Sequence, residues 1–391
     1  MNIVSSPTER TPAAVVAPSR LRTLLPTALS SLGAVVLALL VGAVVIVLSG
    51  DDAVAAYRAL FAGAVGGRRA IAETLVAATP LILGGLAFAV AARAGLFNIG
   101  IEGQLVLGGL AAGIVGAFDL GLPIVLHLPL ALIAAAVAGG LWGGLPGLLK
   151  ARTGAHEVIT TIMLNYLAYR LSTFLIGRDD LLPVVDPELQ ATEPAVDAAR
   201  LPNLLERTRL HAGLLLALLA AAALWYVLFR TTLGYRLRTV GLSRGAAAYA
   251  GISWGRTIVV AMLLSGLLGG LAGAADALGL QGRYYNVASG VGFTAIAVGL
   301  VGRNHPLGVV FAGLLFGALA SGATRMQNTA GTSRDLVQVL LGLVILSVAA
   351  FAAADRFRFR RRAAARGTDE DRSSVVGVEP ELEARAGPPP V

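Results

Sequence analysis

Three polar side chains that could bind a solute or one another lie close together in one apolar stretch. Residues 95–105 read GLFNIGIEGQL, so Asn98, Glu102 and Gln104 interrupt a run of small and aliphatic residues. Asn98 and Glu102 are four residues apart and would share one face of a helix. In lipid, an unpaired polar group costs several kcal/mol, and a charge at mid-helix costs about 2.5–3.5 kcal/mol. Such groups either hydrogen-bond to a neighbouring helix or line a solute path beside a broken helix, and the neighbouring glycines permit both arrangements.

Two further asparagines have comparable apolar surroundings. Asn165 lies in HEVITTIMLNY (156–166), where Thr161 shares its helix face, and Asn286 lies in GRYYNVASGVG (282–292). Hydrogen bonding between helices explains the threonine, whereas an asparagine inside a membrane span is also suited to a solute path. We therefore expect a substrate pathway lined by polar side chains from separate parts of the chain: Asn98, Glu102, Gln104, Asn165 and Asn286.

The composition indicates that these residues lie in a membrane. Of the 391 residues, 56% are hydrophobic and only 14% are charged, against about 25% charged in soluble domains. There is no cysteine, which excludes disulfides and thiolate metal sites. The net charge of +8 comes from arginines clustered between apolar runs. That arrangement follows the positive-inside rule, so nucleic-acid binding is not expected.

The apolar runs predict an all-α, polytopic membrane protein with about ten transmembrane helices. Runs of about 18 or more apolar residues are typical of such spans. A cleaved signal peptide is the alternative for the first run, but that run exceeds the usual apolar length of about 7–15 residues. Asp276 is expected to reach water near the outer end of its helix. The expected spans lie near 28–49, 70–92, 95–118, 122–149, 157–177, 210–229, 257–277, 287–302, 306–324 and 336–354.

The charges between the spans predict their sidedness. Loop 230–256 carries five arginines and no acid, so we expect it to be cytoplasmic. Loop 178–209 carries seven acids against four arginines and is expected outside. Counting spans then places both termini in the cytoplasm. The expected organisation is a cytoplasmic N-terminal tail (1–27), a transmembrane domain (28–354) and a disordered cytoplasmic tail (355–391).

The two polar stretches around Asn98 and Asn286 also suggest internal symmetry. Each places an aromatic–Asn pair after a glycine-rich span. The first follows an inward-running span and the second an outward-running one. Two five-helix halves of opposite orientation, as in inverted-repeat transporters, would produce this arrangement.

Loop 230–256 contains a further functional candidate in GYRLRTVGLSRGAAAYAGI (234–252). Its Ala-rich core and Arg spacing predict a short surface helix around Gly241–Gly251. A basic, lipid-facing loop is the alternative, but it would not explain the ordered Gly–Ala core. We expect this segment to dock on a partner that supplies energy, through Arg236, Arg238, Gly241, Arg244, Ala247, Ala248 and Gly251.

Motifs for independent energy supply or catalysis are lacking. Lys150 is the only lysine and is not part of a GxxxxGK[ST] loop, so the chain has no nucleotide site of that kind. GLSRG (241–245) and GISWG (251–255) match GxSxG by chance, because both lie in an Arg-rich loop rather than at a strand–turn–helix. The four histidines do not form a metal-ligand pattern. We expect no enzymatic activity, metal site or bound cofactor in this chain.

Four stretches together resemble the permease subunits of bacterial ABC importers for nucleosides, simple sugars and branched-chain amino acids. They are GLFNIGIEGQ, HEVITTIMLNY, RTVGLSRGAAAYAGI and YYNVASGVGFTAIAVGLVGRNHPLG, and they look most like the nucleoside and simple-sugar branch. The resemblance covers roughly residues 70–350. In the coupling loop, Thr239 replaces the usual Ala, and Ser243-Arg244-Gly245 stands near the usual Asn-Pro.

This resemblance implies a set of partners. The permease would form a homo- or heterodimer in the bacterial cytoplasmic membrane, in contact with lipid. A separate cytoplasmic ABC ATPase subunit would use ATP and Mg, and an extracytoplasmic solute-binding lipoprotein or periplasmic protein would deliver the solute. The favoured function is nucleoside import, with simple-sugar (ribose-like) import as the alternative. An ion-coupled secondary transporter and a membrane-embedded enzyme are more distant alternatives.

Overall fold

The computed structural model describes most of the chain. It covers residue 33, residues 36–286 except 179, 181 and 183, residues 290–333, and residues 336, 338, 339, 342, 343, 346, 347 and 350. By internal contacts the chain divides into residues 42–345 and a second unit of residues 1–41 and 346–391. Of the second unit, only 33, 36–41, 346, 347 and 350 are described. The expected terminal tails (1–27 and 355–391) therefore lie outside the described residues.

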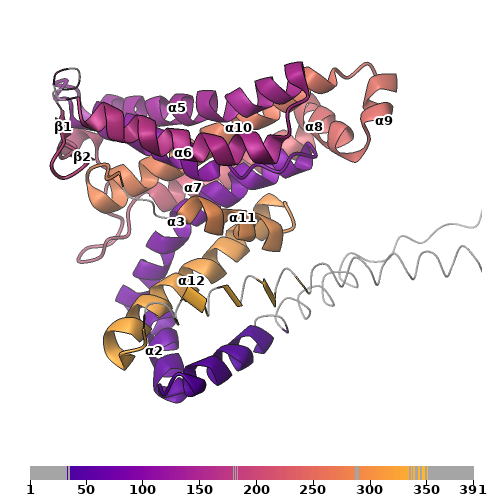
Figure 1. The fold of residues 1–391 in the computed structure, drawn as a ribbon. Helices are drawn as coiled ribbons and strands as arrows, with labels where there is room; N and C mark the ends of the chain where they lie inside the picture. The colour runs from indigo at the N-terminus through magenta and orange to yellow at the C-terminus, as the bar shows by residue number, and fades with distance from the viewer. Residues whose placement is uncertain are drawn as a thin grey trace, which may run out of the picture. The chain divides into compact units, whose positions relative to one another are not determined.

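The first unit is built from helices, with one two-stranded hairpin in the long connection between Ile176 and Gly213 (Figure 1). The helices are α2 (Ala53–Val65), α3 (Arg68–Arg93), α4 (Ile101–Ala117), α5 (Ile124–Thr153), α6 (Glu157–Ile176), α7 (Gly213–Arg230), α8 (Thr232–Leu242), α9 (Arg244–Tyr249), α10 (Trp254–Ala274), α11 (Val291–Val301) and α12 (Pro306–Ala330). A short 3-10 helix η1 (Asp197–Ala199) and a π-helix η2 (Ala275–Gln281) complete the helical elements, and the hairpin consists of β1 (Val185–Asp186) and β2 (Ala191–Thr192).

The prediction of an all-α, polytopic membrane protein is confirmed. Within the described residues, six helices are long and apolar enough to cross a membrane, and four shorter apolar helices accompany them. Helix Val36–Leu48 corresponds to the described part of the first expected span. The last expected span, 336–354, falls largely outside the described residues.

Two of the expected spans, 95–118 and 287–302, form shorter helices than predicted. Between α3 and α4, residues 94–100 are not helical, and Gly95 has φ +78°, a left-handed conformation that stops the helix. The expected span 287–302 is only the short helix α11, preceded by Gly290 with φ +68°. Broken helices of this kind leave backbone groups inside the bundle that other residues must satisfy.

Helix α2 was not expected from the sequence, since it lies between the first two expected spans, 28–49 and 70–92. Asp52 caps it by accepting hydrogen bonds from Val54 N at 2.8 Å and Ala55 N at 3.1 Å. The helix packs against α12, where a Cβ on Gly63 would lie 2.9 Å from Gly322 Cα. Only 13 residues long, α2 gives too short an apolar signal to be identified as a span.

The helices pack in a reciprocal pattern. Helix α3 packs against α11 and α12, α10 packs against α4 and α5, and α3 and α10 pack against each other. Each central helix is therefore covered by the two helices that follow the other one, an exchange that agrees with two related halves. Small residues allow close approach: a Cβ on Gly143 of α5 would lie 2.8 Å from Gly266 Cα of α10.

The hairpin and the short helices α8 and α9 lie at opposite ends of helices α5 and α6 (Figure 1). In the hairpin, Val185 pairs with Thr192 and Asp186 with Ala191. Loops 178–209 and 230–256 are thus on opposite sides of the bundle, as the charge pattern predicts. Which side faces the cytoplasm remains a prediction.

Candidate functional site

Asn98 lies in the break between α3 and α4 and is fully buried. Its Nδ2 donates to Ser265 Oγ of α10 at 2.7 Å, and its Oδ1 accepts from Gly100 N at 2.8 Å. Gln104 lies beside it, with Asn98 Nδ2 3.3 Å from Gln104 Oε1. Ser265 Oγ in turn donates to Ala87 O at 2.6 Å. This network ties the break to α3, α4 and α10.

Asn165 on α6 binds one backbone group of the break and one in the first turn of α4. Its Oδ1 accepts from Gly103 N at 2.8 Å, and its Nδ2 donates to Ile99 O at 3.0 Å. One helical turn earlier, Thr161 Oγ1 accepts from Ile99 N at 3.4 Å. The shared face of these two residues, expected from their spacing, is confirmed and faces inward.

Glu102 is fully buried and binds the start of α11. Its Oε1 accepts from Gly290 N at 2.9 Å, and its Oε2 accepts from Gly292 N at 2.6 Å. Tyr169 of α6 donates its hydroxyl to Oε1 at 2.6 Å. A carboxylate is well placed here because the free N–H groups and the dipole at a helix N-terminus both favour negative charge. One carboxylate therefore joins the two broken helices, one from each half.

Asn286 belongs to a separate group at the hairpin end of α6. Its Nδ2 donates to Thr173 Oγ1 at 2.8 Å, and its Oδ1 accepts from Tyr284 OH at 3.3 Å. Tyr284 OH is also 3.0 Å from Ser172 Oγ. Asn286 is only half-buried, unlike the other four predicted pathway residues.

The structure thus brings the predicted residues together in two groups, one buried around the α3–α4 break and one, with Asn286, at the hairpin end of α6. The four buried ones have their hydrogen bonds satisfied by the protein, which is the helix-to-helix interpretation left open by the sequence. None of the five predicted pathway residues is part of the lining of the three cavities described below. A role of these residues in solute passage remains a prediction.

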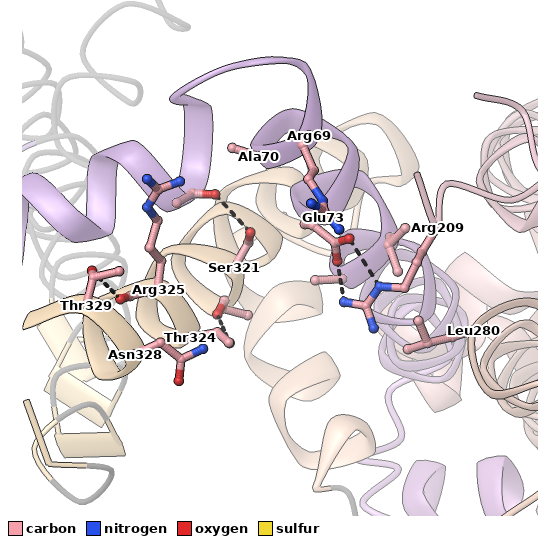
Figure 2. A pocket seen from close by; sticks show the side chains of 14 residues that line it. Arg69, Ala70, Glu73, Arg209, Leu280, Ser321, Thr324, Arg325, Asn328 and Thr329 are labelled. Carbon is pink, nitrogen blue, oxygen red and sulfur yellow. Dashed lines mark hydrogen bonds and ion pairs between the residues drawn. The ribbon is translucent and has the colours of Figure 1, made fainter. Parts of the chain in front are cut away.

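A large cavity, which we call the vestibule, lies between the start of α3 and the end of α12 (Figure 2). Its volume is about 550 Å³. Arg209, from the loop before α7, forms an ion pair with Glu73, with Nε 3.1 Å from Oε1. Arg69 and Arg325 also line the cavity, so cations outnumber acids on its wall. Since Arg209 belongs to loop 178–209, the vestibule is at the hairpin end of the bundle.

Two smaller cavities meet at Asp276. One, of about 240 Å³, is lined by α3, α12, His211 and Asp276, and it shares four residues with the vestibule. The other, of about 330 Å³, adjoins Tyr284 and Tyr285. The expectation that Asp276 simply reaches water is wrong. Asp276 is half-buried and lines both cavities. Burial lowers the pKa of His211 to about 4, so its ring is neutral at pH 7.

The predicted docking segment forms two helices, α8 and α9, rather than one. Ser243 separates them and caps α9 by accepting from Ala246 N at 3.2 Å. Arg236 and Arg244 are exposed, and the Arg244 guanidinium lies 4.2 Å from the centre of the Trp254 ring. Arg238 is half-buried, 5.3 Å from the Phe229 ring centre.

Within α9 the structure corrects one expectation. Ala248 is exposed, as is Gly251 in the turn that follows, but Ala247 is fully buried among this chain's own core residues. Its methyl group therefore positions α9 rather than facing a partner. Two large side chains that the sequence pattern did not single out project outward, Leu242 (88% exposed) and Tyr249 (98% exposed).

Gly241, at the end of α8, packs directly on the break between α3 and α4. A Cβ there would overlap the carbonyl oxygen of Arg93 and lie 2.9 Å from Gly95 N. The end of α3 also holds the turn between α11 and α12, because Arg93 Nε donates to Asn304 O at 2.8 Å. Helix α8 is therefore in backbone contact with the segment that carries Asn98.

Comparison with known proteins identifies relatives over most of the chain. Residues 70–349 match the family described as branched-chain amino acid transport system, permease component. The guanosine ABC transporter permease protein NupP of Bacillus subtilis (strain 168) is 43% identical over 324 residues, which cover 81% of this chain and 91% of that protein. The nucleoside ABC transporter permease protein NupB of Lactococcus lactis subsp. cremoris is 36% identical, covering 81% and 89%. The glucose ABC transporter permease protein TsgB13 of Haloferax volcanii is 37% identical, covering 88% and 92%.

Proposed function

The chain belongs to the family of branched-chain amino acid transport system permease components, and from this we propose that it is the membrane-spanning subunit of an ATP-driven nucleoside importer. The observation that carries the proposal is its similarity, over most of both chains, to a guanosine ABC transporter permease. A relative named as a glucose permease keeps simple-sugar import as the alternative substrate class.

The placement of α8 and α9 supports an external energy source. The chain has no P-loop, so transport against a gradient needs a separate ATPase subunit that binds ATP and Mg. Leu242 and Tyr249 project from the loop most rich in arginine and suit the groove of a protein partner. Movement of this loop would reach the α3–α4 break through the contact of Gly241 with Arg93 and Gly95. This gives an ATPase a mechanical connection to the interior of the permease.

The exposed face of α6 supports a second permease subunit. It carries Arg170 among large exposed side chains, including Met163, Tyr166 and Phe174. Arg170 forms no ion pair with any described residue. Because charged residues in membrane spans generally face protein or water rather than lipid, this face suits a water-filled path completed by another subunit. Asn286 and Thr173 lie at its edge, which agrees with a pathway role for Asn286.

The sidedness follows from the same proposal. The α8–α9 end would face the cytoplasm, with both termini on that side, in the bacterial cytoplasmic membrane. The hairpin end, with the vestibule, would face outward and receive solute from a binding protein. The native chain has no cysteine, so a cysteine introduced at Ser243 is labelled specifically. It should react with a membrane-impermeant reagent only in inverted vesicles.

Uptake in proteoliposomes tests the function directly. The permease would be purified from its native membrane with its associated subunits, and uptake of labelled guanosine, uridine, ribose and glucose would be measured with ATP on the ATPase side. We expect ATP-dependent uptake of nucleosides. Uptake of sugars alone would favour the sugar alternative, and uptake driven by an ion gradient without ATP would contradict the importer class.

A further inference from the structure

The cavity beside Tyr284 and Tyr285, which we call the tyrosine cavity, has features that neither the network around Asn98 nor the vestibule explains. Its volume is about 330 Å³. It lies where α4 meets the π-helix η2 and the segment that follows η2. Its lining residues are Leu105, Val106, Gly109, Gly273, Asp276, Gln281, Tyr284 and Tyr285.

Three polar groups in this cavity have no partner among the described residues. The Asp276 carboxylate, the Gln281 amide and the Tyr285 hydroxyl form no hydrogen bond or ion pair there, whereas the nearby Tyr284 hydroxyl has two possible partners. Asp276 and Gln281 both come from η2. A π-helix is rare and frequently marks a functional site.

The remaining walls suit a flat ring. Tyr285 is 38% exposed, and the Arg283 guanidinium lies 5.8 Å from its ring centre. On the α4 side, Gly109 lacks a side chain and would place a Cβ 3.1 Å from the Tyr284 ring. Leu105 and Val106 supply apolar surface. Aromatic and apolar walls with a few convergent polar groups are typical of a small-molecule site.

The cavity is at the hairpin end, where the proposed binding protein would deliver solute. The hairpin holds the tyrosine segment by backbone bonds, with Thr192 N donating to Tyr284 O at 2.9 Å and Asn286 N donating to Gln190 O at 2.9 Å. The cavity is therefore fixed to loop 178–209 on one side and to the edge of the exposed face of α6 on the other.

We propose that the tyrosine cavity binds the base of a nucleoside and that the Asp276 carboxylate selects guanosine over adenosine. This deepens the proposed function and rests on it. Guanine carries adjacent N–H donors at N1 and at its 2-amino group, which match the two oxygens of a carboxylate. Adenine presents an acceptor at N1 beside its amino group, so a carboxylate opposes that acceptor. The exposed Tyr285 ring offers a stacking surface, and stacking tolerates any base.

The substitution Asp276→Asn tests the selection. An Asn side chain has one acceptor and one donor group, so it matches the N1 acceptor and 6-amino donor of adenine, whereas it can satisfy only one of the two adjacent donors, N1–H and the 2-amino group, that guanine presents to Asp276. Initial uptake rates of guanosine and adenosine would be measured with the whole importer in proteoliposomes, with each nucleoside saturating the binding protein. We expect the guanosine-to-adenosine rate ratio to fall about 5- to 150-fold, the discrimination of one bidentate pair.

Two controls make the result specific. Asp119→Asn changes the same functional group in an exposed turn at Gly121 and should leave the ratio unchanged. Tyr285→Leu should lower uptake of all nucleosides together, whereas Tyr285→Phe should preserve it because the ring remains.

The outcomes separate this inference from the proposed function. If the native importer transports no nucleoside, the proposed function fails, and the inference fails with it. If it transports guanosine but Asp276→Asn leaves the ratio unchanged, or lowers both rates equally in an assembled complex, the base-reading role of Asp276 is refuted while the importer function stands.

Discussion

The contact between α8 and the α3–α4 break predicts that Gly241→Ala impairs transport. The added methyl group would overlap the Arg93 carbonyl and approach Gly95 N to 2.9 Å. Both neighbours are backbone atoms, so no side-chain rotation relieves the overlap. Overpacking typically costs about 1–3 kcal/mol, and alanine recovers about 1 kcal/mol of helix propensity. Because the neighbours are rigid, we expect a net destabilisation of about 2 kcal/mol, expressed as displacement of α8 from the break.

Gly245→Ala is the matched control, since it makes the same change in the same loop. A Cβ at Gly245 meets only the Ser243 hydroxyl, at 3.9 Å. This variant should be neutral or slightly stabilising, because it gains the helix propensity without an overlap.

Three measurements on the purified complex distinguish the variants. We expect Gly241→Ala to lower the unfolding midpoint of the permease and to transport less solute per ATP hydrolysed, while the ATPase still co-purifies. Gly245→Ala should match the native complex in all three. Equal behaviour of the two variants would refute the idea that α8 transmits movement through Gly241.

Three further predictions follow from the other contacts. Glu102→Gln should destabilise the permease by at least about 2 kcal/mol, because an amide cannot accept all the hydrogen bonds that the carboxylate receives; a normal unfolding midpoint with lost uptake would instead assign Glu102 to the solute path. Burial gives His211 a pKa of about 4 in the folded chain, against 6.5 in the unfolded chain. Between these two pH values the unfolded chain therefore binds more protons than the folded chain. Stability should therefore drop by about 3 kcal/mol between pH 6.5 and 4, and His211→Asn should remove that part of the drop in pH-dependent unfolding. Tyr249→Ser should reduce co-purification of the ATPase, whereas Tyr226→Ser, at an exposed tyrosine on α7, should not.

The polar residues around the α3–α4 break show which contacts residue spacing can predict and which it cannot. The four-residue interval between Thr161 and Asn165 correctly predicted a shared face, because helix geometry fixes which residues are neighbours. Asn98 and Glu102 were expected to share a face as well. The helix actually begins at Ile101, so Asn98 lies in the break and bonds to α10, while Glu102 bonds to α11. A glycine-rich sequence permits a break without fixing where it occurs.

Asp276 and Ala247 show a different limit. An acid near a helix end normally reaches water, and an alanine in an exposed loop is free to face a partner. Neither expectation survives, because Asp276 lines cavities formed by distant segments and Ala247 packs into the core. Leu242 and Tyr249 were missed for the same reason, since exposure depends on where neighbouring helices lie.

The sequence alone determined the membrane environment, most of the spans and the opposite placement of the two long loops. These properties depend on local composition, because lipid excludes charge over any run long enough to cross it. The tertiary structure decided which polar groups are satisfied by the protein and which remain available to a solute. Glu102 and Asp276 are both carboxylates in apolar runs, yet one is bound by a helix N-terminus and the other has no partner among the described residues. That difference depends on the packing of segments more than a hundred residues apart, which no local pattern encodes.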